Sequence, residues 1–375
     1  MVSRGGSVDP AKFPDEKFDL YSIPAFDRGT SDIVQGADIG STKQVVRPGD
    51  VLLSKIVPHI RRSWVVGPSR GHRVIASGEW IVFRSSAAHP PYLRHVLTGD
   101  PFHAQFMATV SGVGGSLLRA RPAFVARIDV PLPPIEEQRR IAEVLDRAAA
   151  LRAKRREALA HLDDLTQSIF LDMFGAPVRN PLRLPTSTVG DSAVQVTDGE
   201  HQTPRREADG IRLLSARNVR DGFLDLTNVD YIGDAEFDRI RRRCEPTRGD
   251  ILISCSGTIG RVSQVRSETP FALVRSVALV RPDVQRVTST FLEHQLRQPT
   301  IKALMLQRAN ASSQANLFQN QIRSLPLVLP PVSYQSQFGS RAATIDTVRD
   351  VQRAQLAQLD VLFGSLQQRA FSGQL

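Results

Sequence analysis

The chain contains two copies of one pattern, and each copy closes with a proline pair followed by a long helical segment. Pro133-Pro134 ends the first globular stretch and Pro330-Pro331 ends the second, so the shift from 133 to 330 is 197 residues. The match continues without gaps into the helix. Pairs at this shift include Arg152/Arg349, Arg156/Arg353, Leu159/Leu356, Leu162/Leu359, Asp163/Asp360, Leu165/Leu362 and Phe174/Phe371.

A second motif confirms that the repeat extends upstream of the helices. The segment 47–54, Arg-Pro-Gly-Asp-Val-Leu-Leu-Ser, recurs at 247–254 as Thr-Arg-Gly-Asp-Ile-Leu-Ile-Ser, shifted by 200. Two diverged copies of a globular domain plus a helix predict an approximate two-fold relation. Such a chain is suited to two copies of a target or of a partner.

Both helical segments have the apolar stripe of a coiled coil. From Val144 to Ile169, and again from Ile345 to Arg369, the stripe residues follow a 4-3-4-3 spacing. Each helix of this length spans roughly 55 Å at 1.5 Å per residue, and its stripe must be buried. We expect the two helices to pack on each other. The alternative is that they are independent core helices of separate domains.

The composition limits the class of protein. The 375 residues include 48 Lys and Arg against 38 Asp and Glu, and the net charge of +10 favours a polyanionic partner. Two cysteines cannot form a disulfide framework or a four-cysteine zinc site. The segment 1–12 lacks the apolar core of a signal peptide, and no apolar run approaches the length of a membrane span. We therefore expect a soluble, cytoplasmic protein.

Short elements are predicted in both globular stretches. Strands are expected at 51–56, 80–83, 210–219 and 249–254, and helices at 92–97 and 290–307. The segment 128–132 is read as an edge strand, because its proline cannot donate to a central ladder. The first copy is expected to lack a counterpart of 190–216.

Candidate catalytic motifs are weak. His89-Pro90-Pro91-Tyr92 is close to the motif with which amino-methyltransferases hold a target amine, but that motif begins with Asn, Asp or Ser. A helix start with proline in its first turn explains these residues better. The 14–17 segment lacks the upstream acid of a metal-dependent nuclease, no P-loop is present, and His201 has no partner at metal-ligand spacing. We predict neither a catalytic nor a metal site in this chain.

The loops after the Gly-Asp strands and before the final strands carry the side chains that read base edges or clamp phosphates. Ordinary solvated loops are the alternative for any one residue. The candidate DNA-binding residues are Lys55, His59, Arg61, Arg62, Ser116, Ser256, Thr258, Arg261, Arg308, Asn310, Ser313, Gln314 and Asn316. The run 239–243 is either a solvated helix end or a phosphate contact. On the helices, the recurring Arg152, Arg156, Arg349 and Arg353 are either partner-binding or solvated.

Several of these motifs recur in one order. They include 132–142 (Leu-Pro-Pro-Ile-Glu-Glu-Gln-Arg-Arg-Ile-Ala), Leu145-Asp146, 168–175 and the turn 256–260. With them the chain resembles the specificity subunit of type I restriction-modification systems over nearly all of its length. The resemblance implies an α+β fold in which two similar α/β target-recognition domains are separated by two long antiparallel helices. The target-recognition domains would be 1–132 and 176–329, and the spacer helices 133–175 and 330–375.

The resemblance also implies a function without a catalytic site. Each domain would read one half of a split double-stranded DNA target, and the helices would dock two methyltransferase subunits. AdoMet, ATP and Mg would belong to the methyltransferase and restriction subunits, with no cofactor in this chain. The other hypotheses are a self-contained adenine methyltransferase that uses the His89 motif, and a coiled-coil scaffold that does not read DNA. Methylation by the chain alone would favour the methyltransferase hypothesis. Absence of sequence-selective DNA binding would favour the scaffold hypothesis.

Overall fold

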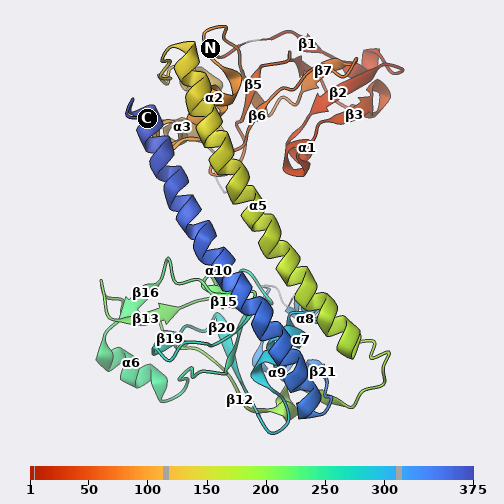
Figure 1. Cartoon of the computed structure of the whole chain (residues 1–375), viewed down its shortest axis with the longest axis vertical. Coiled ribbons are helices and arrows are strands. Elements are labelled where there is room, and N and C mark those ends of the chain that lie inside the picture. The colour runs from red at the N-terminus through yellow and green to blue at the C-terminus, as the bar shows by residue number, and fades with distance from the viewer. Residues whose placement is uncertain (4, 113–117, 310–314) are drawn as a thin grey trace. The chain divides into compact units, whose positions relative to one another are not determined.

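The chain folds into two compact units, each of which draws on two separate parts of the sequence. The computed structural model describes residues 1–3, 5–112, 118–309 and 315–375. Unit 1 consists of Met1–Arg156 and Ala354–Leu375, and unit 2 of Glu157–Arg353. The long helices α5 (Ile135–Phe174) and α10 (Val332–Phe371) contribute to both units (Figure 1). Sheets and helices in each unit give the expected α+β fold class.

Unit 2 is built on an antiparallel sheet with the strand order β12-β20-β17-β18. These strands are β12 (Ala193–Asp198), β17 (Ile251–Ser254), β18 (Val262–Gln264) and β20 (Val277–Pro282). A neighbouring sheet has the order β16-β13-β19, from β13 (Ile211–Leu214), β16 (Asp230–Ile232) and β19 (Phe271–Leu273). The hairpin β14 (Val219–Arg220) and β15 (Phe223–Leu224) follows β13. The strands expected within 210–219 and 249–254 are confirmed as β13, β14 and β17.

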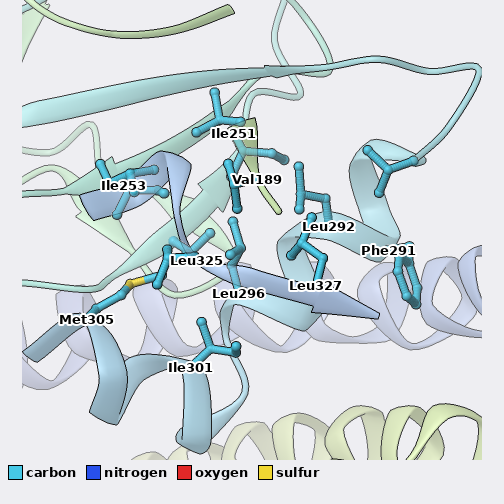
Figure 2. Close-up of a cluster of buried hydrophobic side chains, with 14 of the residues drawn as sticks. Val189, Ile251, Ile253, Phe291, Leu292, Leu296, Ile301, Met305, Leu325 and Leu327 are labelled. Atoms are coloured by element: carbon cyan, nitrogen blue, oxygen red, sulfur yellow. The ribbon is translucent and has the colours of Figure 1, made fainter. Parts of the chain in front are cut away.

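Several helices of unit 2 cover one face of its central sheet. Alternate side chains of β17 point to opposite faces, so Ile251 and Ile253 share one core cluster while Leu252 belongs to another. The first cluster includes Phe291 of α7 (Ser289–Leu296) and Met305 of α8 (Pro299–Ala309), as Figure 2 shows. The remaining helices are α6 (Asp234–Arg241) and α9 (Gln319–Arg323). The single helix predicted at 290–307 is therefore two helices, because Pro299 starts the second one.

Unit 1 repeats this arrangement. Its sheet has the order β6-β5-β8, from β5 (Val51–Ser54), β6 (Ser63–Val65) and β8 (Trp80–Phe83), and a bridge from Val2 to Phe83 adds the edge that β12 forms in unit 2. Helices α2 (Pro90–Thr98) and α3 (Asp100–Ala108) follow, then β9 (Val110–Ser111), β10 (Arg119–Ala120) and α4 (Pro122–Val125). The strands expected at 51–56 and 80–83 and the helix at 92–97 are confirmed.

The second sheet of unit 1 corrects one expectation. It has the order β1-β4-β7-β2-β3, from β1 (Ser7–Val8), β2 (Lys17–Tyr21), β3 (Asp32–Gln35), β4 (Lys43–Val45) and β7 (Arg73–Ala76), with α1 (Ile23–Arg28) after β2. Strand β2 pairs in parallel with β7 and antiparallel with β3, as β13 pairs with β19 and β16. The first copy therefore contains counterparts of much of 190–216, built from the segment 1–21.

The edge strand expected at 128–132 is not formed. In unit 2 the equivalent β21 (Pro326–Val328) pairs with β11 (Thr186–Thr188), which precedes the sheet domain. Unit 1 offers no such partner strand among its described residues. Pro131 instead accepts a hydrogen bond at its carbonyl from the Tyr92 hydroxyl, at 3.0 Å. A strand without a neighbour has no ladder to join, so this segment stays irregular.

A buried glutamine anchors the first turn of each long helix. The Gln138 amide accepts from the His89 backbone N–H at 2.7 Å and donates to the carbonyls of Ala87 and Pro133. In unit 2 the Gln335 amide accepts from the Thr288 N–H at 2.8 Å and donates to the carbonyls of Arg286 and Pro330. His89 and Thr288 are the N-caps of α2 and α7. The glutamine therefore ties the long helix to the helix that covers the sheet.

A buried aspartate explains the repeated Gly-Asp motif. Asp50 is 2 % exposed and pairs with the Arg84 guanidinium through two hydrogen bonds of 2.7 and 2.6 Å. Asp250 is likewise 2 % exposed and pairs with Arg281 at 2.9 and 2.7 Å. Each arginine donates these hydrogen bonds to its carboxylate, and the interaction raises the pKa of the arginine. This bidentate pairing fixes β5 against the end of β8 in unit 1. In unit 2 it fixes β17 against the end of β20 in the same way.

No helix in the described part of the chain is both long and apolar enough to cross a membrane.

Replacing Gln138 by Leu should lower the free energy of unfolding by about 1–3 kcal/mol, because three buried backbone groups lose their partner. Gln368→Leu is the matched control, since Gln368 is exposed on α10 in the same unit. The measurement is the urea midpoint of each variant followed by circular dichroism. Equal midpoints for the two variants would show that the glutamine does not stabilise the fold.

Candidate nucleic-acid and subunit interfaces

The two loop segments predicted to contact DNA in unit 2 lie together. The loop after β17 and the segment before α9 are joined by a hydrogen bond from the Leu317 N–H to the Cys255 carbonyl, at 2.9 Å. Beside it, Ser256 forms an isolated antiparallel bridge with Asn316. Segments far apart in the sequence therefore form one surface at the end of the central sheet.

Unit 1 has the same junction. The Ala120 N–H donates to the Lys55 carbonyl at 2.8 Å, and Ile56 forms a bridge with Arg119. Lys55 follows β5 as Cys255 follows β17, and Ala120 precedes α4 as Leu317 precedes α9. The structure thus places the predicted loops at equivalent positions in the two units.

Several of the predicted DNA-binding side chains have partners within the chain. Arg61 forms an ion pair with Asp100 at 2.6 Å, and Arg62 with Asp27 at 2.8 Å. Arg308 donates to the carbonyl of Gln321 at 2.7 Å, which ties α8 to α9. These arginines shape the loops. Contact with DNA would require Arg61 and Arg62 to share or exchange their carboxylate partners.

The other predicted residues differ in exposure. His59 and Thr258 are exposed, while Lys55, Ser256, Arg261 and Asn316 are partly buried. The Arg261 backbone N–H donates to the Ser254 hydroxyl at 2.9 Å, which closes the turn that follows β17. Ser116, Asn310, Ser313 and Gln314 lie outside the described residues.

A polar network that the sequence did not predict lies beside these loops. The Asp198 carboxylate, at the end of β12, accepts from Gln319 Nε2 of α9 at 2.7 Å and from Arg243 at 2.7 Å. His201 Nε2 lies 2.9 Å from the same carboxylate. The loop interpretation of His201 is therefore refined: its Nε2 lies beside both the Asp198 carboxylate and, at 3.0 Å, the Arg243 guanidinium. No spacing in the sequence indicates this network, because Arg243 and Gln319 come from segments far from 198–201.

The basic run 239–243 is largely neutralised by neighbouring acids. Arg239 pairs with Glu200 at 2.9 Å and with Glu236 at 2.8 Å, and Arg243 pairs with Asp198. Burial raises the pKa of Glu200, but hydrogen bonds from the Gln202 backbone and from Arg239 outweigh it, so the net pKa is lowered. Glu200 is thus held as a carboxylate, and Arg239 and Arg243 anchor the end of β12 and the residues that follow it.

The His89 motif is structural. His89 is the N-cap of α2, Pro90 starts the helix, and Tyr92 is fully buried against Phe371 with ring centroids 6.1 Å apart. Burial raises the pKa of Tyr92 to about 12. A buried tyrosine cannot stack on a target base, so the motif gives no support to a methyltransferase site. Among the described residues, no group of three or more His, Cys, Asp or Glu side chains could hold a metal ion.

The helices α5 and α10 pack on each other, as the stripe predicts, and they run antiparallel, as the resemblance implies. In unit 1 Arg152 of α5 reaches Asp360 of α10 at 2.6 Å, and its guanidinium lies 4.3 Å from the centre of the Phe363 ring. Arg156 reaches the same carboxylate at 3.1 Å. These contacts join α5 to α10 within unit 1. The alternative of independent core helices is wrong.

In unit 2 the equivalent arginine is buried. Arg349 is 1 % exposed and lies between Asp346 of its own helix and Asp163 of α5, with Thr166 accepting a further hydrogen bond at 3.1 Å. Arg353 lies 4.0 Å from the centre of the Phe223 ring. Burial lowers the pKa of Arg353, and the positive charge of Arg349 adds to this effect. Arg349 therefore cannot present its guanidinium to a partner, which corrects the expectation for this residue.

An apolar groove follows the helix pair of unit 1. It has a volume of about 530 Å³ and is lined by Leu151, Leu359 and Leu362 together with Lys154 and Arg155. Leu151 is 54 % exposed and Leu362 is 50 % exposed. Leucines left in water on a paired helix are an unfavourable surface that a partner would cover. The groove is therefore an exposed apolar surface on the helix pair of unit 1.

Comparisons with curated proteins point to one group of relatives. The type I restriction enzyme EcoBI specificity subunit of Escherichia coli is 23 % identical over 276 residues, which cover 66 % of this chain and 58 % of the relative. The EcoKI specificity subunit of Escherichia coli strain K12 is 22 % identical over 287 residues, covering 70 % and 61 %. The matches thus span about three fifths of these relatives' length. No model of a known protein family matches the chain.

Solved structures show the same fold. One comes from a study of complex assembly and conformational transition of a type I restriction-modification system, with a TM-score of 0.50 and 20 % identity over 100 % of this chain and 96 % of that one. Another is the S subunit of a type I system from M. genitalium, with a TM-score of 0.50 and 12 % identity over 96 % and 89 %. The resemblance inferred from the sequence is confirmed.

Removing both carboxylates beside Arg349 should destabilise unit 2. The double variant Asp163→Asn with Asp346→Asn leaves a buried guanidinium uncompensated, and breaking a buried ion pair in this way costs about 3–5 kcal/mol. Asp350→Asn is the control, because the Asp350 side chain is 70 % exposed. Thermal and urea unfolding of the three proteins compares them. An unchanged transition in the double variant would contradict the role given to Arg349.

Proposed function

We propose that this chain is the DNA-sequence recognition subunit of a type I restriction-modification complex, and that it reads a bipartite target with one unit per half. It contributes no catalytic group of its own. The specificity subunits that it resembles support this assignment, and the duplicated junction of loops supports the division into two readers.

The observation that carries the proposal is the equivalence of the two loop junctions. Lys55 with Ala120, and Cys255 with Leu317, bring the same pair of loops together at the end of the same sheet. The framework beneath them is shared, since Asp50–Arg84 and Asp250–Arg281 hold both sheets in the same way. Two similar surfaces with different side chains match the requirement for reading two different half-sites. The excess positive charge of the chain supplies attraction to phosphates.

The helix pair is the proposed docking surface for two methyltransferase subunits, and restriction subunits would join through the same complex. The apolar groove at Leu151 and Leu362 supports this placement, because its exposed leucines gain from burial. AdoMet, ATP and Mg would be bound by those partner subunits. The scaffold hypothesis predicts the same helix surface but no selective binding of DNA, so DNA binding separates the two.

Purified chain should bind duplex DNA selectively, and its affinity should fall steeply with salt as counterions are released. Arg261→Ala should weaken one half-site by about 1–3 kcal/mol if its guanidinium contacts a base. A phosphate contact would instead weaken all sequences and reduce the salt slope by about one. Fluorescence anisotropy with a duplex selected from a random library provides the measurement.

Arg248→Ala is the control, since Arg248 is exposed and pairs with Glu268. Absence of any sequence preference in the unmodified chain would refute the proposal, and methylation by the chain alone would favour the enzyme hypothesis.

The docking surface makes a separate prediction. Leu151→Asp with Leu362→Asp places two charges in the groove and should greatly reduce co-purification of a co-expressed methyltransferase subunit. Val284→Asp is the control, because Val284 is 62 % exposed and belongs to neither α5 nor α10. Charge reversal at Arg152 is less informative, since it would break the pair with Asp360 inside the chain. Full retention of the partner by the double variant would exclude the groove as its docking site.

A further inference from the structure

Each unit contains a pocket at the junction of its loops, and the two pockets occupy equivalent places. In unit 2 the pocket has a volume of about 370 Å³ and in unit 1 about 390 Å³. Cys255 lines the first and Lys55 the second, and both residues directly follow the Gly-Asp strand. The Gly-Asp motif marks one wall of each pocket, but no motif in the sequence indicates the other walls.

Strand register confirms that the pockets correspond. Ala278 lines the pocket of unit 2 and pairs with Ile253, while Ile81 lines the pocket of unit 1 and pairs with Leu53. The opposite wall is also equivalent. It is formed by Gln319 and Asn320, which begin α9, and by Pro122 and Ala123, which begin α4.

The linings differ although the frames agree. The unit 2 pocket presents Asp198, His201, Arg275, Gln319 and Asn320. In the unit 1 pocket the wall at Pro122 and Ala123 is apolar, and the polar side chains come from other positions, such as Gln44 and Lys55. Divergence inside a common frame is what two readers of unlike sequences require.

The polar groups of the unit 2 pocket are held in place. Gln319 Nε2 donates to Asp198 at 2.7 Å, so the amide oxygen of Gln319 remains as an acceptor. Asn320 Oδ1 accepts from the Gln321 backbone N–H at 2.9 Å, which leaves the Nδ2 group as a donor. Arg275 is exposed and forms no side-chain hydrogen bond with the described residues. Burial raises the pKa of Cys255 to about 12, so the thiol that lines the pocket stays neutral.

The geometry points to these two pockets as the base-reading subsites of the chain, an inference that rests on the proposed function. In unit 2 the Arg275 guanidinium and the Gln319 and Asn320 amides read base edges. Asp198 is a positioning residue that sets the orientation of Gln319. Arginine and amide side chains are the groups that discriminate bases by paired donors and acceptors. In unit 1 the ammonium group of Lys55 takes the corresponding place for the other half-site.

Selection of bound duplexes from a library with two randomised segments tests this inference on the full chain. Arg275→Ala and Asn320→Ala should each change the preferred bases in one half-site and lower affinity for the original site about 5- to 150-fold. Lys55→Ala should change only the other half-site. Arg248→Ala, on an exposed turn of unit 2, should leave both preferences unchanged.

A further variant distinguishes positioning from direct contact. Asp198→Asn keeps the shape of the side chain but weakens its hold on Gln319, and it should broaden the preference in the unit 2 half-site. Thermal unfolding midpoints equal to that of the unmodified chain establish that each variant is folded.

The outcomes separate this inference from the proposed function. If the unmodified chain selects no sequence, both fail. If it selects a bipartite sequence and the pocket variants select the same one, the pockets are not the reading sites while the proposed function stands. If the variants weaken all sequences equally, the pockets contact the DNA backbone and the inference is overturned.

Discussion

The architecture depends on a buried amide at the start of each long helix. Gln138 and Gln335 are 1 % and 0 % exposed, and each satisfies a carbonyl before its own helix, a carbonyl before the sheet-covering helix and the N-cap N–H of that helix. An amide is suited to this task because it offers an acceptor and two donors without a charge to desolvate. Glutamate could accept but not donate, and leucine could do neither. Each sheet domain is thereby fixed to the base of one long helix.

The helix pair is stabilised by a different kind of interaction in each unit. In unit 1 Arg152 and Arg156 share Asp360 near the surface, where solvent weakens the pair. In unit 2 Arg349 is enclosed between two carboxylates. An enclosed guanidinium stabilises only while its partners remain, but it tolerates no change of register, because a shift along the helix would leave it unpaired. The buried arginine therefore specifies the alignment of α5 with α10 in unit 2.

The sequence predicted the features that repeat, because a repeat reveals itself by comparison with its other copy. The proline pairs, the Gly-Asp strands and the helical stripes at 144–169 and 345–369 are all of this kind. The prediction from the repeat failed where a strand in one copy has a pairing partner that the other copy lacks. An edge strand was expected at 128–132, but only its counterpart β21 has a partner strand, β11. The prediction also failed for Arg349, since spacing places a residue on a helix face but does not show whether a second helix covers that face.

The pockets could not be predicted because their walls converge from distant segments, and because the residues that define them differ between the copies. This difference has an energetic basis. Asp50, Asp250 and the anchoring glutamines are buried, so replacing them strands polar groups and costs stability. Arg275 and Asn320 face solvent, where substitutions usually change stability by less than about 0.5 kcal/mol. A chain built in this way can change what its pocket presents without loss of the fold. Its frame therefore stays recognisable from one copy to the other while its reading surface does not.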